Sequence, residues 1–500
     1  MKRADELFEV IKAMTTQERR TFEQRSSFLK RDKKYLKLFK VLSSLESYDE
    51  KKLRSILAGE PMLRALHVAK HYLFELVLDF LATRSLPSSV AAKLSIEVNK
   101  IEILWDRGLF KQFNFRMKKQ KKIAERIESF DNLLRIIDGE RKLVIRNIYT
   151  SSSDLVKELS HQQKAIFTQL MRQNEYKELD DISKIDFAIL GPPRDKSAAQ
   201  KIKKFLSQAL LMDYSMATTF LAKEYYHIVR GRCHYRLRNL PEAKRNATAA
   251  VSLFEDYPEW KTIAPFEHLS ALTWLYISLY SLEEYSEAEK TLKVLQGIPE
   301  YNPYFGAYAF QLISSYEVHL IVQKKEVSEL KEFILRTRSQ IKKYSHFIDH
   351  VRMSVLNFGL SYAHFALGDY EKALVYLNEI FNEFGHESIS DFPSALRLYN
   401  LVLHYELGHK EYIRYASRST SQYLRRRKQL SKGEKAVIIL LKALSSASSA
   451  EKKLESLKSF CEYATRLSNN PMEANFTQLF DIISWAEDKK KANEKKMKEK

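Results

Sequence analysis

Residues 360–374 read LSYAHFALGDYEKAL, and this stretch predicts two helices joined by a tight turn. Gly368 suits such a turn because glycine adopts left-handed backbone conformations without a steric penalty. Ala373 permits the second helix to approach the first closely. Weaker versions of the stretch recur along the chain, so the sequence predicts an array of helical hairpins.

The turn motif returns at a steady interval. Its copies begin at Leu237, Leu282, Val322, Leu367 and Leu407, so successive copies lie 40 or 45 residues apart. A period of roughly 40 residues is typical of one helical hairpin per repeat. Because one hairpin cannot bury its apolar face alone, neighbouring hairpins must stack. We therefore expect an all-α chain folded as an α-solenoid of stacked antiparallel hairpins.

These hairpins resemble tetratricopeptide repeats. The matching residues are Leu360, Leu367, Gly368, Asp369, Tyr370 and Ala373 in the sharpest copy, Tyr285 and Ala288 in the copy at 282, and Ala243 in the copy at 237. The period exceeds the roughly 34 residues of that family, the early Trp is absent and the closing Pro is inconsistent. The resemblance is therefore to a divergent array with lengthened helices. It implies a scaffold that binds a protein or peptide on its concave face.

Composition and punctuation divide the chain into five expected parts. They are a compact helical N-terminal unit at 1–86, irregular helical hairpins at 90–190, the repeat array at 196–415, capping helices at 416–486 and a disordered Lys-rich tail at 487–500. The break at 191–193 is Gly-Pro-Pro, which cannot continue a helix. Within 90–190 we expect turns at Gly108 and at 173–179, with further interruptions at Gly139 and at 150–153.

The overall composition excludes several classes of protein. Gly and Pro number only 12 and 11, which favours helices over the many turns of an all-β fold. Two cysteines, Cys233 and Cys461, are too few for a disulfide framework and indicate a reducing compartment. Neither a signal peptide nor an apolar run of membrane-spanning length is apparent. We therefore expect a cytoplasmic protein without a membrane span.

No local motif predicts catalysis. Gly-rich phosphate loops are absent from the sequence. His67 and His71 share a helix face, but the Glu that a zinc protease needs after the first His is missing. Cys233 beside His234 is interpreted as a packed thiol. Adjacent acids such as Asp180 and Asp181 point to different helix faces. We expect no enzyme, no metal, no cofactor and no small-molecule substrate.

Basic clusters keep a second function open. The formal net charge is +20, which favours polyanionic partners. One cluster contains Lys118, Lys119, Lys121 and Lys122 on a helix behind three phenylalanines; another contains Arg425, Arg426, Arg427 and Lys428. The first is interpreted as the wet face of a helix, and the second as the better partner site. The alternative to a peptide-binding scaffold is thus a nucleic-acid-binding protein, whether ribosome-associated or regulatory.

Overall fold

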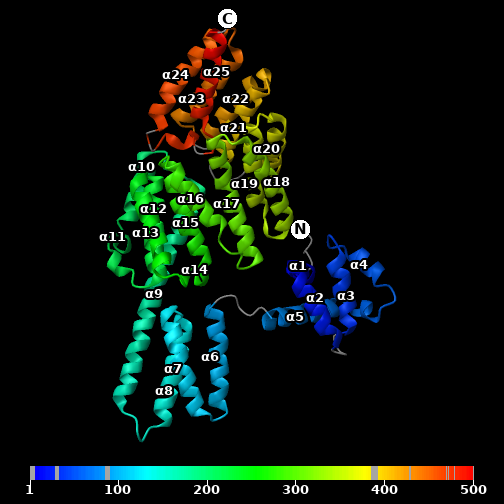
Figure 1. Cartoon of the computed structure of the whole chain (residues 1–500), viewed down its shortest axis with the longest axis vertical. Coiled ribbons are helices and arrows are strands. Elements are labelled where there is room, and N and C mark those ends of the chain that lie inside the picture. The colour runs from blue at the N-terminus through cyan, green and yellow to red at the C-terminus, as the bar shows by residue number, and fades with distance from the viewer. Residues whose placement is uncertain are drawn as a thin grey trace. The chain divides into compact units, whose positions relative to one another are not determined.

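All regular secondary structure in the described residues is helical, which confirms the expected all-α class (Figure 1). The computed structural model describes residues 6–28, 33–84, 90–384, 392–426, 430–468, 470, 472–477 and 479–498. These residues form two compact units, Met1–Asn99 and Lys100–Lys500. The boundary lies within helix α6 (Val90–Asp106), beyond the expected end of the N-terminal part at residue 86.

The first unit packs short helices around its own apolar core. They are α1 (Glu6–Ala13), α2 (Thr16–Phe28), α3 (Lys33–Ser44), α4 (Glu50–Ile56), the 3₁₀ helix η1 (Pro61–Ala65) and α5 (Leu66–Arg84). Thr15 and Glu18 form a capping box at the start of α2, because each backbone N–H donates to the other's side chain. The Asp49 carboxylate similarly caps α4. Ile11, Leu42 and Val77 are fully buried where these helices meet.

After the end of α6, the second unit continues with three antiparallel helices. They are α7 (Phe110–Arg126), α8 (Phe130–Arg146) and α9 (Ser153–Leu190). The expected turn at 173–179 is wrong, because α9 continues through it and buries Tyr176, whose hydroxyl donates to the Leu210 carbonyl at 2.8 Å. Gly139 does not interrupt α8 either. Its missing Cβ makes room for Met117 and Phe113, so the glycine serves close packing of α7 on α8.

Five helical hairpins then form the array. They are α12–α13 (Phe220–Arg236, Leu240–Asp256), α15–α16 (Pro265–Ser281, Tyr285–Gln296), α17–α18 (Pro303–Lys324, Val327–Lys343), α19–α20 (His350–Ala366, Tyr370–Phe384) and α21–α22 (Phe392–Glu406, Lys410–Arg426). Short helices α10 (Lys196–Leu206), α11 (Ala209–Met212) and α14 (Trp260–Ile263) fill the connections. First helices contact one another in succession, as α12 with α15, α15 with α17 and α17 with α19. This is the packing expected of a solenoid.

Every hairpin turn of the array has the same backbone geometry. Arg238, Glu283, Lys325, Gly368 and Gly408 have φ values of 60°, 62°, 58°, 76° and 75°. The next residue's N–H donates back five residues, as in Asp369 N to His364 O at 2.9 Å, which is a Schellman motif. The copy expected to begin at Val322 is displaced, because its left-handed residue is Lys325 and not Gln323. The corrected register keeps the repeats 40 to 45 residues apart.

Helices α23 (Lys432–Ser446), α24 (Ala450–Ser468) and α25 (Ile482–Lys498) follow the array. The segment expected as a disordered tail is helical through Lys498. Its start is anchored by Glu406, which accepts a hydrogen bond from Trp485 Nε1 and pairs with Lys489 Nζ, both at 2.6 Å. Among the described residues, no helix combines the length and apolar character needed to cross a bilayer.

Candidate functional site

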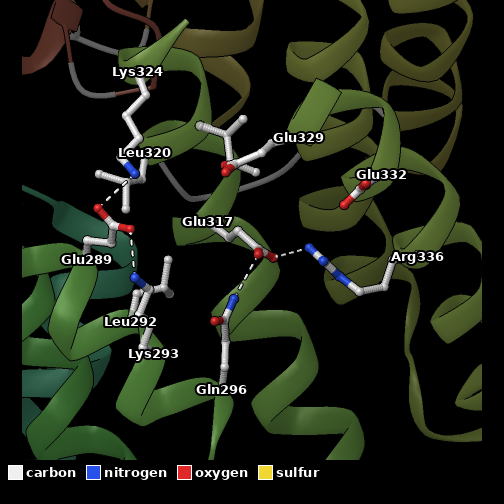
Figure 2. Close-up of a pocket in the computed structure, with 11 residues that line it drawn as sticks. Glu289, Leu292, Lys293, Gln296, Glu317, Leu320, Lys324, Glu329, Glu332 and Arg336 are labelled. Atoms are coloured by element: carbon white, nitrogen blue, oxygen red, sulfur yellow. Dashed lines mark hydrogen bonds and ion pairs between the residues drawn. The ribbon is translucent and has the colours of Figure 1, made fainter. Parts of the chain in front are cut away.

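A charged groove opens between the second helices α16 and α18, with the first helix α17 as its floor (Figure 2). Its volume is about 260 Å³. Leu292, Leu320 and Ile321 form the apolar part of the lining. The charged part consists of Glu289, Lys293, Glu317, Lys324, Glu329, Glu332 and Arg336, with the amide of Gln296 beside them. Three different helices therefore supply the polar wall.

Glu317 is the best-held charge in the groove. It is buried on α17, accepts a hydrogen bond from Gln296 Nε2 at 2.8 Å and pairs with Arg336 at 2.7 Å. Burial raises the pKa of Glu317, while the Arg336 guanidinium opposes this change. Because these contacts join α16, α17 and α18, they fix the spacing of the three helices (Figure 2).

Glu289 is the second anchor. Its carboxylate pairs with Lys324 at 2.7 Å and with Lys293 at 3.0 Å. The hydrogen bonds from these two ammonium groups lower the pKa of Glu289, so the carboxylate is ionised near neutral pH. Together with the pair of Glu317 and Arg336, this triad engages all three cations that line the groove.

Two carboxyl groups on α18 are left over. Glu329 lies against the Glu326 carboxyl, and this contact raises the pKa of Glu329. Glu332 also faces the groove from α18 (Figure 2). Four carboxyl groups against three cations give the lining a formal charge of −1. The lining of the groove therefore carries a small excess of negative charge.

A second groove lies on the other flank of α18, between α18, α19 and α20. Its volume is about 570 Å³. The lining carries Arg338 and Lys342 against the single carboxyl of Glu379, with Ile341, Met353, Leu360 and Tyr376 as the apolar part. The formal charge is thus +1. The two grooves are related by one hairpin of the array and have opposite charge.

The turn residues singled out in the sequence shape the hairpins of the array. Ala243, Ala288 and Ala373 are buried where the two helices of their hairpins cross. Asp369 pairs with Lys372 at 2.7 Å at the start of α20. The Tyr285 and Tyr370 rings pack edge-on against Tyr280 and Phe365 of the preceding helices. Leu367 and Gly368 form the turn itself. This arrangement makes them parts of the scaffold.

The basic clusters lie apart from both grooves. Lys118, Lys119 and Lys122 are exposed on α7, whereas Lys121 pairs with Glu140 of α8 at 2.7 Å. Phe113 is buried, whereas Phe115 is 74% exposed. Arg425 and Arg426 are exposed at the end of α22. Arg427 and Lys428 lie outside the described residues.

The sequence also offered candidates for metal binding and catalysis: two histidines, one cysteine and a pair of adjacent aspartates. His67 and His71 are exposed, and within the described ranges no group of three or more His, Cys, Asp or Glu is arranged to hold a metal ion. Burial raises the pKa of the Cys233 thiol to about 11, which disfavours the nucleophilic thiolate. Asp180 is buried while Asp181 is exposed, so this adjacent pair is divided between two helix faces as expected.

Sequence reasoning did not find the grooves or the buried charges between α9 and α12. Arg232 Nη1 lies 3.0 Å from Asp180 Oδ1 although the two residues are 52 positions apart. Both side chains are almost fully buried, and Glu224 is buried close by. The signal in the sequence is that Arg232 and Glu224 lie on one largely buried helix. Because unpaired charges are rarely buried, such residues indicate charged partners elsewhere in the chain.

The chain matches no protein-family model and no curated protein. Its own geometry defines the class: an all-helical, solenoid-like chain whose helices pack in neighbouring pairs, compatible with a helical repeat.

Proposed function

We propose that this chain is a non-catalytic, tetratricopeptide-like scaffold that binds an extended segment of a partner protein. The carrying observation is the groove over α17, where an apolar floor lies beneath fixed ion pairs and two surplus carboxylates, Glu329 and Glu332. A Lys or Arg of the bound segment complements these carboxylates. We therefore propose a site between second helices, whereas the resemblance implies the concave face.

The opposite charges of the two grooves define the partner further. A segment that crosses α18 meets a formal charge of −1 on one flank and +1 on the other. Complementary potentials favour correct partners and suppress wrong ones. The bound segment therefore carries a basic residue followed or preceded by an acidic one, with apolar residues between them.

The test is a quantitative pull-down with the Glu329→Lys, Glu332→Lys double variant. Both side chains are exposed, so the change reverses charge without opening the core. The matched control, Asp256→Lys with Glu371→Lys, makes the same change in net charge on exposed residues elsewhere. Proteins retained by wild type and control but lost by the groove variant support the proposal. Identical protein sets for all three chains contradict it.

A second candidate function, binding of single-stranded nucleic acid, is favoured by helix α22. Ile413, Ser417 and Leu424 bury one face of this helix. On the outward face lie Arg414, Tyr415, Arg418, Arg425 and Arg426. Tyr415 is 77% exposed, so its ring is free to stack on a base while the arginines contact phosphates.

Fluorescence anisotropy with a labelled oligouridylate tests this candidate. Arg418→Glu with Arg425→Glu is expected to weaken binding at least ~10-fold and to flatten its salt dependence. Lys118→Glu with Lys119→Glu, which changes the net charge equally on α7, is the control. Equal losses in both variants would reduce the effect to net charge and refute a site on α22.

A further inference from the structure

Helix α9 carries an apolar stripe that the other described helices of the second unit leave uncovered. Phe167, Met171, Ile182, Ile185 and Ile189 are between 37% and 60% exposed. At about 100° per residue they fall within roughly 60° of one another around the helix, on a face that differs from the buried positions against α8 and α12. From Phe167 to Ile189 the stripe extends for roughly 33 Å along the helix.

Exposed apolar residues that gather on one face of a helix mark an interaction site. Isolated apolar residues on a surface need no explanation, but five on one line of one helix do. Asn174 and Glu178 divide the line into two apolar patches, Phe167 with Met171 and Ile182 with Ile185 and Ile189. The stripe is separate from the charged grooves, because none of its residues lines either of them.

The spacing of the stripe is symmetric about one residue. Phe167 and Ile189 lie 11 positions on either side of Glu178, and Met171 and Ile185 lie 7 positions on either side. Asn174 and Ile182 lie 4 positions from it. An antiparallel pair of identical helices has this symmetry, because a two-fold axis through the central residue maps each position onto its counterpart.

We propose that α9 is a self-association surface on which a second copy of this chain docks its own α9 antiparallel. Met171 then packs against Ile185 of the second copy, and Phe167 packs against its Ile189. The two Glu178 carboxylates meet at the two-fold axis, where their repulsion weakens the pair. The association is therefore reversible, and substitution of Glu178 alone changes its strength.

Sedimentation equilibrium of the full-length chain tests the pairing. Met171→Glu alone and Ile185→Lys alone each place a charge opposite an apolar side chain, so each is expected to weaken the dimer at least ~10-fold. The double variant brings the introduced carboxylate of one copy opposite the introduced ammonium group of the other, at both ends of the pair, and restores the dimer. Glu178→Leu strengthens it. Ile148→Lys, an equally exposed apolar residue outside the stripe, leaves it unchanged.

Three outcomes would overturn the proposal. A wild-type chain that stays monomeric at the highest attainable concentration removes it. A dimer that the two single variants leave intact places the interface elsewhere. A double variant no better than the single ones excludes the antiparallel register, since parallel helices would pair each of the two positions with itself. Circular dichroism of each variant separates loss of pairing from loss of fold.

Discussion

Lys325 and Gly368 occupy the same left-handed position in two turns, but the conformational free energy of that position differs between a lysine and a glycine. A residue with a Cβ loses roughly 1 kcal/mol there relative to glycine. No atom lies within 4 Å of the position that a Cβ on Gly368 would take, so only the backbone conformation would be strained. The turn at Gly368 was predictable from sequence because glycine marks it. The turn at Lys325 was predicted two residues too early, since a lysine gives no such signal.

Removing the glycine at position 368 and introducing one at position 325 should therefore change the free energy of unfolding in opposite directions. Gly368→Ala is expected to lower the free energy of unfolding by about 1 kcal/mol, and Lys325→Gly to raise it by about 1 kcal/mol. Urea denaturation checks both changes. Gly297→Ala is the control, because Gly297 has φ of −84° and a Cβ there meets only ordinary contacts. A loss of similar size in the control would show that left-handed strain is not the cause.

Helices α9 and α12 are joined by buried charge as well as by apolar contact. Arg232 pairs with Asp180, and Glu224 Oε2 has no hydrogen-bond partner in the described part of the chain. Burial, helped by the nearby Asp180 carboxylate, raises the pKa of Glu224 well above its ordinary value of 4.5. Sequence reasoning could not reveal this, since it predicted a turn at 173–179, directly before Asp180. Partners 52 residues apart meet only once α9 is continuous.

The stability of this junction should depend on pH through Glu224. The folded state keeps a proton that the unfolded chain releases near pH 4.5, so stability falls as pH rises above that value towards the folded-state pKa. Glu224→Gln removes the titration. The variant should melt above wild type at about pH 8 and close to it at pH 4.5. Thermal melts at both values, with exposed Glu371→Gln as the control, would contradict this if the difference did not grow with pH.

At the scale of the whole molecule, the hairpin architecture was predictable and the two grooves were not. A repeated turn reports only the local chain, and its interval near 40 residues was enough to predict stacked hairpins. The groove over α17 depends on Glu289, Glu317 and Arg336, which come from three helices and share no sequence pattern. The length of α9 was missed because residues 173–179 form a polar run typical of a turn. This run stays helical because Tyr176 and Leu179 are buried on one side of it.

The position of helix α18 beside both grooves affects how easily this helix opens locally. The groove over α17 borders its first half, at Glu329, Glu332 and Arg336, and the second groove borders its last turns, at Arg338, Ile341 and Lys342. The helix is held by the buried side chains of Leu330, Phe333, Ile334 and Thr337. Segments with fewer packed neighbours open at lower free energy than the core around them. In this array, local opening of α18 would widen both grooves. Under the proposed function, a segment bound across α18 would restrict this motion, and the entropy lost by the helix would set part of the affinity.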